Sequence, residues 1–179
     1  MDNQGGKKPV ILKEGEYTLE DLESLKKHQS VRRTSDIYSE LHDEFLNTKF
    51  LKKDTEDRRE GELFGDWIYF PWSGILLHTV NKTEYEAVRT NRNKNLIRDE
   101  EQEKLLASTI AIAGLSVGNA IALTLTYNGI GNTMKLAEYD VISASNLNRI
   151  RAGIIDIGLP KIEIVARQLY EINPYAELI

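Results

Sequence analysis

The fold is decided by one stretch of the chain, TIAIAGLSVGNAIALTLTYNGIGNTMKLAEYD, which spans residues 109–140. It opens with the apolar run Thr109–Ala113, which has no polar alternation and is typical of a parallel strand covered on both faces. The glycines of Gly114–Gly118 predict a tight turn after this strand. Small and apolar side chains over residues 119–127 then favour a helix that lies close to a sheet.

The second half of the same stretch completes a strand–helix–strand unit. Gly129-Ile130-Gly131 predicts the end of the helix, because glycine commonly terminates helices. Residues 134–137 predict a second strand, and Glu138-Tyr139-Asp140 places two acids at its carboxyl end. Strand, glycine turn, helix, strand and acid, in this order, predict the first half of a Rossmann-type nucleotide site.

The parts of this unit suit a ligand that carries phosphate. Glycine lets the backbone approach a phosphate, and a helix start at residues 117–119 would offer unpaired N–H groups at its positive end. An acid about 20 residues further on can accept hydrogen bonds from ribose hydroxyls. A strict G-x-G-x-x-G pattern is absent, because Ala113 and Leu115 occupy the first two glycine positions when Gly118 takes the third. A glycine turn without a ligand therefore remains an alternative interpretation.

Two cations follow the acids. Arg149 ends the segment Ser145-Asn146-Leu147-Asn148-Arg149, and Lys161 ends Gly158-Leu159-Pro160-Lys161. Both are expected near the carboxyl edge of the sheet, where ligands bind in folds of this kind. A nicotinamide dinucleotide has two phosphate charges, whereas a triphosphate that loses pyrophosphate needs more cations. Each cation alone is more often a solvated surface charge, but together with Asp140 they favour a triphosphate.

Composition narrows the class of protein. The chain has 179 residues, a formal charge of −5 and a pI of about 5.3, which gives no support to nucleic-acid binding through a general positive field. Cysteine is absent, which excludes disulfides, thiolate metal sites and a cysteine nucleophile from this chain, and the three histidines lack metal-ligand spacing. No apolar run approaches the roughly 18–20 residues of a membrane span, and no signal peptide opens the chain. These observations predict a cytoplasmic protein that binds neither nucleic acid nor membranes.

The N-terminal part differs from the rest in its charge. Of residues 1–62, 27 are charged, so we expect this part to bury little of itself and to form solvated helices. Thr18 predicts the start of one helix, and Ser35 is expected to cap a second. Short aromatic and branched runs within residues 67–77 predict a strand pair across a turn.

Two more helices lead into the nucleotide unit. Lys82–Arg89 predicts one of them, and Asp99 is expected to cap the other. The predicted fold is therefore α/β, with an incomplete Rossmann-like parallel sheet preceded by a mainly helical, charged N-terminal segment. We expect the segment to span residues 1–88 and the first half of a nucleotide-binding domain to span residues 89–179.

Four ordered motifs occur between residue 89 and the end of the chain. They are Arg89-Thr90-Asn91-Arg92-Asn93, Glu101-Gln102-Glu103-Lys104-Leu105, Glu138-Tyr139-Asp140 with Ser145-Asn146-Leu147-Asn148-Arg149, and Gly158-Leu159-Pro160-Lys161 with Ile172-Asn173-Pro174. In this order and spacing they resemble the ThiF/MoeB/HesA family, the adenylating domain shared with ubiquitin-activating enzymes. Upstream, Tyr69-Phe70-Pro71-Trp72 is similar to a bacterial subgroup with an extra N-terminal segment, sometimes fused to a nitroreductase-like domain.

The resemblance implies a reaction and its partners. In this family the C-terminal carboxylate of a ubiquitin-like or sulfur-carrier protein attacks the α-phosphorus of ATP, which gives an acyl-adenylate and pyrophosphate. ATP and Mg²⁺ are therefore the implied ligands, and Asp140 would contribute to the Mg²⁺ geometry. The family also implies a homodimer, in which Arg92 reaches into the other subunit as an arginine finger. The implied catalytic residues are therefore Arg92, Asp140, Arg149 and Lys161.

The resemblance also implies the positions that bind the nucleotide. Glu138 stands where the family has an aspartate that contacts the ribose, Arg149 and Lys161 would grip the triphosphate, and Asn146 would complete the phosphate pocket. The implied nucleotide-binding residues are Gly114, Ser116, Gly118, Glu138, Asp140, Asn146, Arg149 and Lys161.

The chain departs from the family in several places, one of which is Thr90, where the family usually has an aromatic residue. The turn keeps few of the family's glycines, and Glu138 is one methylene longer than aspartate. The chain also stops at Tyr175-Ala176-Glu177-Leu178-Ile179, where the family begins its third strand, so the resemblance implies a fragment of a longer enzyme. Two alternatives stay open: a catalytically degenerate scaffold subunit of the same fold, and a Rossmann oxidoreductase that binds NAD or FAD.

Overall fold

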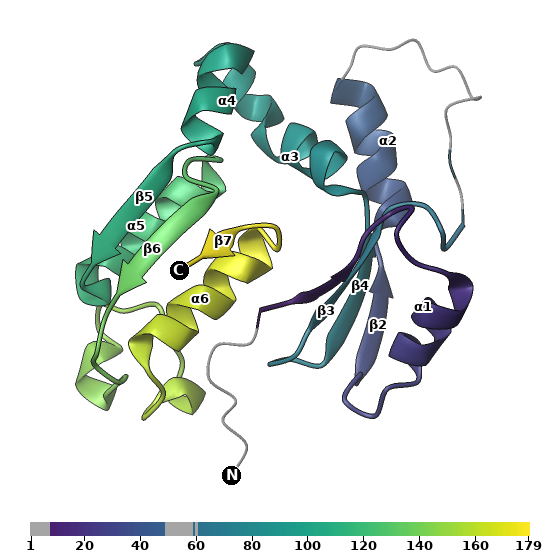
Figure 1. Ribbon diagram of the computed structural model, residues 1–179. Helices are drawn as coiled ribbons and strands as arrows, with labels where there is room; N and C mark the ends of the chain where they lie inside the picture. The colour runs from purple at the N-terminus through teal and green to yellow at the C-terminus, as the bar shows by residue number, and fades with distance from the viewer. Residues whose placement is uncertain (1–7, 49–58, 60) are drawn as a thin grey trace. The chain divides into compact units, whose positions relative to one another are not determined.

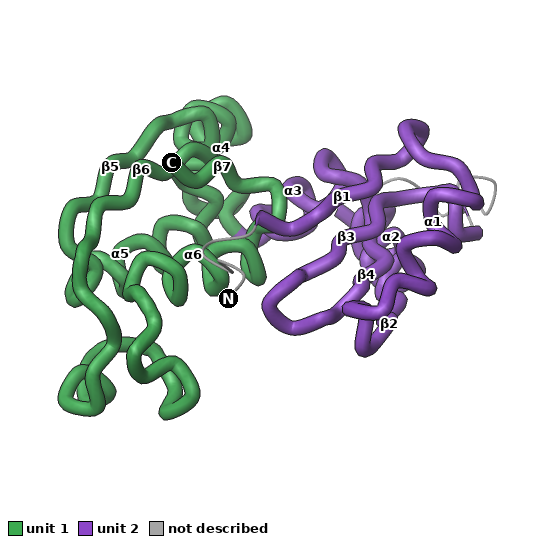
Figure 2. Tube along the Cα trace, turned by 60° about the horizontal axis from the view of Figure 1, so that its bottom comes forward, with its two compact units in different colours: residues 1–6, 93–179 green, residues 7–92 purple. Residues whose placement is uncertain are grey.

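The computed structural model describes residues 8–48, 59 and 61–179, which belong to two compact units. One unit is built from residues 7–92 and the other from residues 93–179, and Figure 2 distinguishes them by colour. The boundary thus follows Arg92, whereas the sequence predicted it after residue 88. Within the described residues, no helix has the length and apolar character needed to cross a membrane.

The N-terminal unit contains a four-stranded sheet with the order β1-β3-β4-β2 (Figure 1). β3 (Asp66–Phe70) and β4 (Ile75–Thr79) form the antiparallel pair that the sequence predicts. β1 (Val10–Leu12) extends this pair antiparallel to β3, and β2 (Arg33–Asp36) pairs with β4 in parallel. The expectation of a mainly helical segment is therefore corrected: two further strands make it a sheet with accompanying helices.

The first two helices of this unit differ in how well the sequence predicts their starts. α1 (Leu19–Lys26) begins after Thr18, whose side chain forms a capping box as expected. α2 (Tyr38–Thr48) begins later than expected, because Ser35 lies in β2 and caps no helix. Instead, the carboxylate of Asp36 accepts a 3.0 Å hydrogen bond from the first backbone N–H of α2.

The core of the N-terminal unit lies where α1 meets the sheet. Buried aromatic and branched side chains from α1, from the segment just before it and from the sheet pack together there, and they are Tyr17, Leu22, Trp67, Tyr69 and Leu76. α3 (Lys82–Thr90) follows β4, as the sequence predicts. Its N-cap is Asn81, whose side chain accepts a hydrogen bond from the N–H of Glu84. This cap fixes the first turn of α3.

The C-terminal unit is built on a three-stranded parallel sheet with the order β5-β6-β7 (Figure 1). β5 (Thr109–Ala113) and β6 (Thr133–Ala137) are the two predicted strands, and α5 (Leu115–Tyr127) connects them. α6 (Lys161–Ile172) leads to the short strand β7 (Glu177–Leu178). The predicted strand–turn–helix–strand unit is confirmed.

Helices α5 and α6 cover the same face of this sheet. Their buried residues share one core with the strands, namely Ile112, Leu115, Ala122, Leu123, Met134, Leu136, Val165 and Leu169. On the opposite face, Ala111, Ala113 and Lys135 are exposed. The expectation that β5 is covered on both faces is therefore wrong for the residues that the structure describes.

The remaining helices are short. α4 (Asp99–Leu106) precedes β5, and its N-cap is Arg98, so Asp99 is the first helical residue and not the cap. The Glu101 carboxylate accepts a 2.9 Å hydrogen bond from the N–H of Arg98 and closes this start. Three single 3₁₀ turns complete the described elements, at Asn91–Asn95, Ala144–Asn146 and Ile154–Asp156.

Candidate nucleotide site

The turn between β5 and α5 leaves open space in front of its backbone. Gly114 has φ = +86°, a conformation that L side chains rarely adopt, and a Cβ built there would meet no atom within 4 Å. The helix begins at Leu115, two residues before the predicted start at 117–119, so its first N–H groups are those of residues 115–117. The turn therefore offers a backbone surface that a phosphate could approach closely.

Gly118 has a different role in the same turn. A Cβ at this position would lie 2.6 Å from Cγ2 of Ile112, so the absent side chain lets α5 lie close against β5. This is the packing role that the third glycine has in dinucleotide-binding turns. Gly118 therefore contributes to the site by letting α5 lie close against β5.

The start of α6 is joined to the end of β6 by backbone contacts. Val141 and Pro160 form an isolated antiparallel bridge, and Ile142 donates a 2.8 Å hydrogen bond to the carbonyl of Leu159. The N–H of Lys161 donates to the carbonyl of Asp140 at 3.0 Å. These contacts bring two of the predicted site residues together although 21 positions separate them in the chain.

The side chain of Lys161 connects three of the predicted residues. Its Nζ donates to Oδ2 of Asp140 at 2.8 Å and to Oγ of Ser116 at 3.4 Å. The Lys161 side chain is 4% exposed, whereas that of Asp140 is 51% exposed. A buried ammonium needs anionic or polar partners, and here it lies between the end of β6 and the first turn of α5.

The carboxylate of Glu138 is committed to the backbone. Oε2 accepts a hydrogen bond from the N–H of Leu115 at 2.8 Å, and Oε1 accepts from Tyr139 at 2.9 Å and Asp140 at 3.1 Å. The bond from Leu115 is the main cause that lowers the pKa of Glu138. Glutamate is one methylene longer than the aspartate of the family, and this length lets the carboxylate reach the start of α5. The sequence analysis did not predict this contact.

Asn146 and Arg149 lie on the loop after β6, and within the described residues no hydrogen bond or ion pair joins either side chain to Lys161. Asn146 is buried, and its Oδ1 accepts a 3.1 Å hydrogen bond from the N–H of Ser143, which closes the 3₁₀ turn. Arg149 is exposed, and its Nη1 donates to the Ser145 carbonyl at 3.2 Å and to Asn148 Oδ1 at 3.0 Å. The guanidinium thus keeps further donors available to a ligand.

Two predicted roles remain, that of Arg92 as an arginine finger and that of Asp140 at a Mg²⁺ site. Arg92 is an exposed residue of the 3₁₀ turn Asn91–Asn95 and belongs to the N-terminal unit. Among the described residues there is no group of three or more histidine, cysteine or acidic side chains that could hold a metal ion. Asp140 alone could contribute to a Mg²⁺ site, which fits a metal that takes one or two carboxylates together with phosphates.

The model of the ThiF family matches residues 89–179. "Uncharacterized protein MT1398" of Mycobacterium tuberculosis is 44% identical to the chain over 109 residues, which cover 61% of the chain and 15% of that protein. Ubiquitin-like modifier-activating enzyme 5 of Drosophila willistoni is 33% identical over 96 residues, which cover 53% of this chain and 23% of that protein. The crystal structure of E. coli tRNA N6-threonylcarbamoyladenosine dehydratase matches with a TM-score of 0.50 and 25% identity, covering 52% of this chain and 39% of that one. The chain thus spans 15% to 39% of the length of these relatives.

Proposed function

Because the chain belongs to the ThiF family, we propose that its C-terminal unit is an ATP-dependent adenylyltransferase module. Its substrate would be the C-terminal carboxylate of a ubiquitin-like or sulfur-carrier protein, activated as an acyl-adenylate. The observation that carries this proposal is the position of Lys161. Its buried ammonium lies at the open glycine turn, against Asp140 and Ser116, where the charge of a phosphate chain would develop.

The chemistry asks for positioning and charge more than for a protein nucleophile. A carboxylate oxygen of the partner forms a bond to the α-phosphorus of ATP, and the bond to the bridging oxygen breaks as pyrophosphate leaves with the electron pair. Lys161 would hold a phosphate oxygen at the turn, and the exposed Arg149 would bind the phosphates that depart. The N–H groups of Ser116 and Val117 would add neutral donors, since Glu138 already binds that of Leu115.

Asp140 fits the one metal that the reaction needs. Its carboxylate is half exposed and lies beside the ammonium that would face the phosphates. Mg²⁺, when bound, would neutralise phosphate charge and favour departure of pyrophosphate.

We also propose a cytoplasmic homodimer in which Arg92 acts in the other subunit. This arrangement would give a role to an arginine that belongs to neither α5 nor α6.

The partner is proposed from its chemistry. The name of one relative refers to a ubiquitin-like modifier, and the name of another refers to a modified tRNA nucleoside. The net charge of −5 favours a protein carboxylate over a polyanion such as tRNA. We therefore propose a carrier protein as the substrate and treat tRNA as an outcome of the test.

Two measurements test the proposal. Calorimetric titration with MgATP, AMP and NADH should give the highest affinity for MgATP, whereas preference for NADH would indicate an oxidoreductase. Exchange of labelled pyrophosphate into ATP should then depend on a peptide that ends in a free glycine carboxylate, and the same peptide amide should be inactive. ATP binding without exchange, for the peptide and for tRNA alike, would identify a scaffold subunit and overturn the enzymatic proposal.

A further inference from the structure

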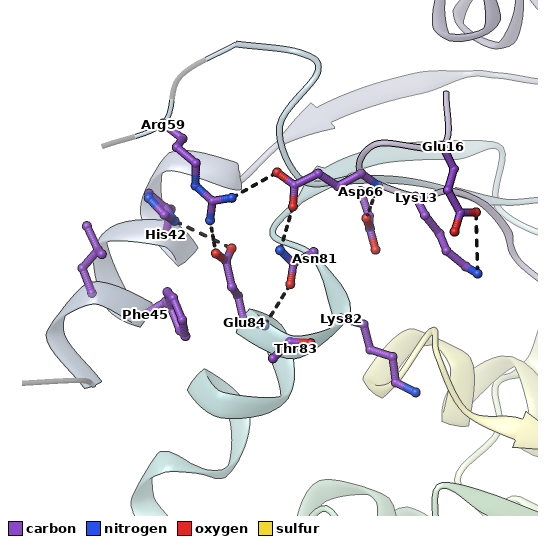
Figure 3. A pocket seen from close by; sticks show the side chains of 12 residues that line it. Lys13, Glu16, His42, Phe45, Arg59, Asp66, Asn81, Lys82, Thr83 and Glu84 are labelled. Atoms are coloured by element: carbon purple, nitrogen blue, oxygen red, sulfur yellow. Dashed lines mark hydrogen bonds and ion pairs between the residues drawn. The ribbon is translucent and has the colours of Figure 1, made fainter. Parts of the chain in front are cut away.

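The N-terminal unit contains a cavity that the proposed adenylation does not use. Its volume is about 620 Å³, which is the size of a site for a small organic ligand. The segment after β1, helix α2, the start of β3 and the first turn of α3 all contribute to its lining (Figure 3). All of these residues belong to the same compact unit, so the cavity is a property of that unit alone.

One oxygen of a buried carboxylate in this cavity lacks a hydrogen-bond donor among the described residues. Glu84 is 4% exposed, and in Figure 3 its carboxylate faces both His42 and Arg59. Its Oε1 binds the guanidinium of Arg59, but Oε2 has no hydrogen-bond partner in the part of the chain that the structure describes. Nδ1 of His42 lies 3.7 Å from Oε2, which is beyond hydrogen-bond distance. Because an unsatisfied buried carboxylate oxygen is costly, this atom indicates a missing donor.

The buried part of the cavity is negative. Asp66 and Glu84 are 2% and 4% exposed, so both acids lie deep. The two lysines of the lining lie at its rim, since the side chains of Lys13 and Lys82 are 61% and 49% exposed. Among the inner side chains of the lining, the carboxylates of Glu14, Asp66 and Glu84 outnumber the single guanidinium of Arg59. A cation is therefore favoured there over an anion.

A guanidinium of the chain itself already binds carboxylates of this cavity. Arg59 donates one arm of its guanidinium to Glu84 and the other to Oε1 of Glu14 at 3.1 Å. The ring of Phe45 lines the same cavity and offers an apolar surface for a stem. We infer that this cavity binds an organic cation, a guanidinium or primary ammonium group on an apolar stem, with Glu84 as the receptor carboxylate. The cation could come from a free small molecule or from a basic side chain of a partner protein.

Calorimetric titration of the full chain with matched probes tests this inference. Butylguanidinium should bind at least about tenfold more tightly than butylurea, which has the same stem without the charge. An N-acetylated Gly-Arg-Gly amide, compared with its citrulline analogue, distinguishes the two sources. Tighter binding of the arginine peptide than of butylguanidinium indicates a partner side chain, and the reverse order indicates a small molecule. Equal binding of butylurea, or no saturable binding of any cation, would overturn the inference.

Two variants identify the receptor within the cavity. Glu84→Gln should weaken butylguanidinium at least about tenfold, whereas Glu16→Gln, at a lining carboxylate whose side chain is 68% exposed, should change it less than about twofold. Thr83→Lys provides a second test that leaves the core intact, because Thr83 is an exposed lining residue and the added cation should also weaken binding. Circular dichroism reports the folding of each variant. Unchanged affinity in both Glu84→Gln and Thr83→Lys would exclude Glu84 as the receptor.

Discussion

The ammonium of Lys161 is almost completely buried, yet it forms a 2.8 Å ion pair with Asp140, a residue whose side chain is half exposed. The pair therefore has one side in the protein and one side open to solvent or to a ligand. Neutralising the cation leaves an aspartate that water can solvate. The pair is consequently better suited to hold a ligand than to stabilise the fold.

The first prediction follows from this asymmetry. Lys161→Met should keep the fold, with a change in the free energy of unfolding of less than about 1 kcal/mol, because Asp140 remains solvated. The same variant should lose about ten- to a hundredfold in MgATP affinity, since a charge-assisted contact is removed. Urea denaturation and calorimetry measure the two effects. Lys135→Met, on the exposed face of β6, should change neither.

The second prediction concerns the exposed cation of the loop after β6. Arg149→Ala should weaken MgATP binding by about ten- to a hundredfold, and Arg149→Lys should recover only part of this loss, because a forked donor becomes a point charge. Arg151→Ala removes an exposed arginine two positions away and serves as the matched control. Equal ATP affinity in wild type and Arg149→Ala would contradict the phosphate role of Arg149.

The third prediction tests the close packing of α5 on β5. Gly118→Ala places a methyl group 2.6 Å from Cγ2 of Ile112, a branch next to the backbone that cannot swing away. Overpacking of this kind should lower the free energy of unfolding by about 1–3 kcal/mol in urea denaturation. Gly153→Ala, where the nearest atom lies 3.6 Å away, should be tolerated. In an Ile112→Ala background the clash is gone, so Gly118→Ala should cost less there.

The fourth prediction concerns pH. The backbone N–H of Leu115 lowers the pKa of Glu138 below 4.5, its ordinary value, so the unfolded chain takes up the proton first as the solution is acidified. The stabilisation by this carboxylate is therefore present above pH 4.5 and is lost as the pH falls through the folded-state pKa. The difference in unfolding free energy between wild type and Glu138→Gln should be largest near about pH 6 and shrink toward about pH 3. A constant difference over this range would contradict the role of the charge, and Glu103→Gln, at an exposed position of α4, is the control.

The C-terminal unit of the fold was predictable because its signals are local. The run Thr109–Ala113 is a strand with the expected bounds, and the strand expected at residues 134–137 begins one residue earlier, as β6. The strands β1 and β2 were not predictable, since Val10–Leu12 is very short and Arg33–Asp36 is polar. Their place in a sheet depends on pairing with distant strands, which sequence periodicity does not report.

The candidate site was predicted in its composition but not in its contacts. Motif order placed Lys161 and Asp140 at the same edge, and the structure joins them. The contact of Lys161 with Ser116, and the reach of Glu138 to the start of α5, depend on side-chain conformations that only packing determines. The cavity at Glu84 was missed for a similar reason, because five separate segments come together to form it.

The three hydrogen bonds to Glu138 have a consequence for the sugar of a bound nucleotide. A carboxylate offers about four lone-pair positions, and backbone N–H groups already occupy three of them. One position on Oε2 remains for a hydroxyl, so the acid can recognise one sugar hydroxyl and not a pair of them. We therefore expect only one of the two deoxy analogues, 2′-deoxy-ATP or 3′-deoxy-ATP, to bind more weakly than ATP.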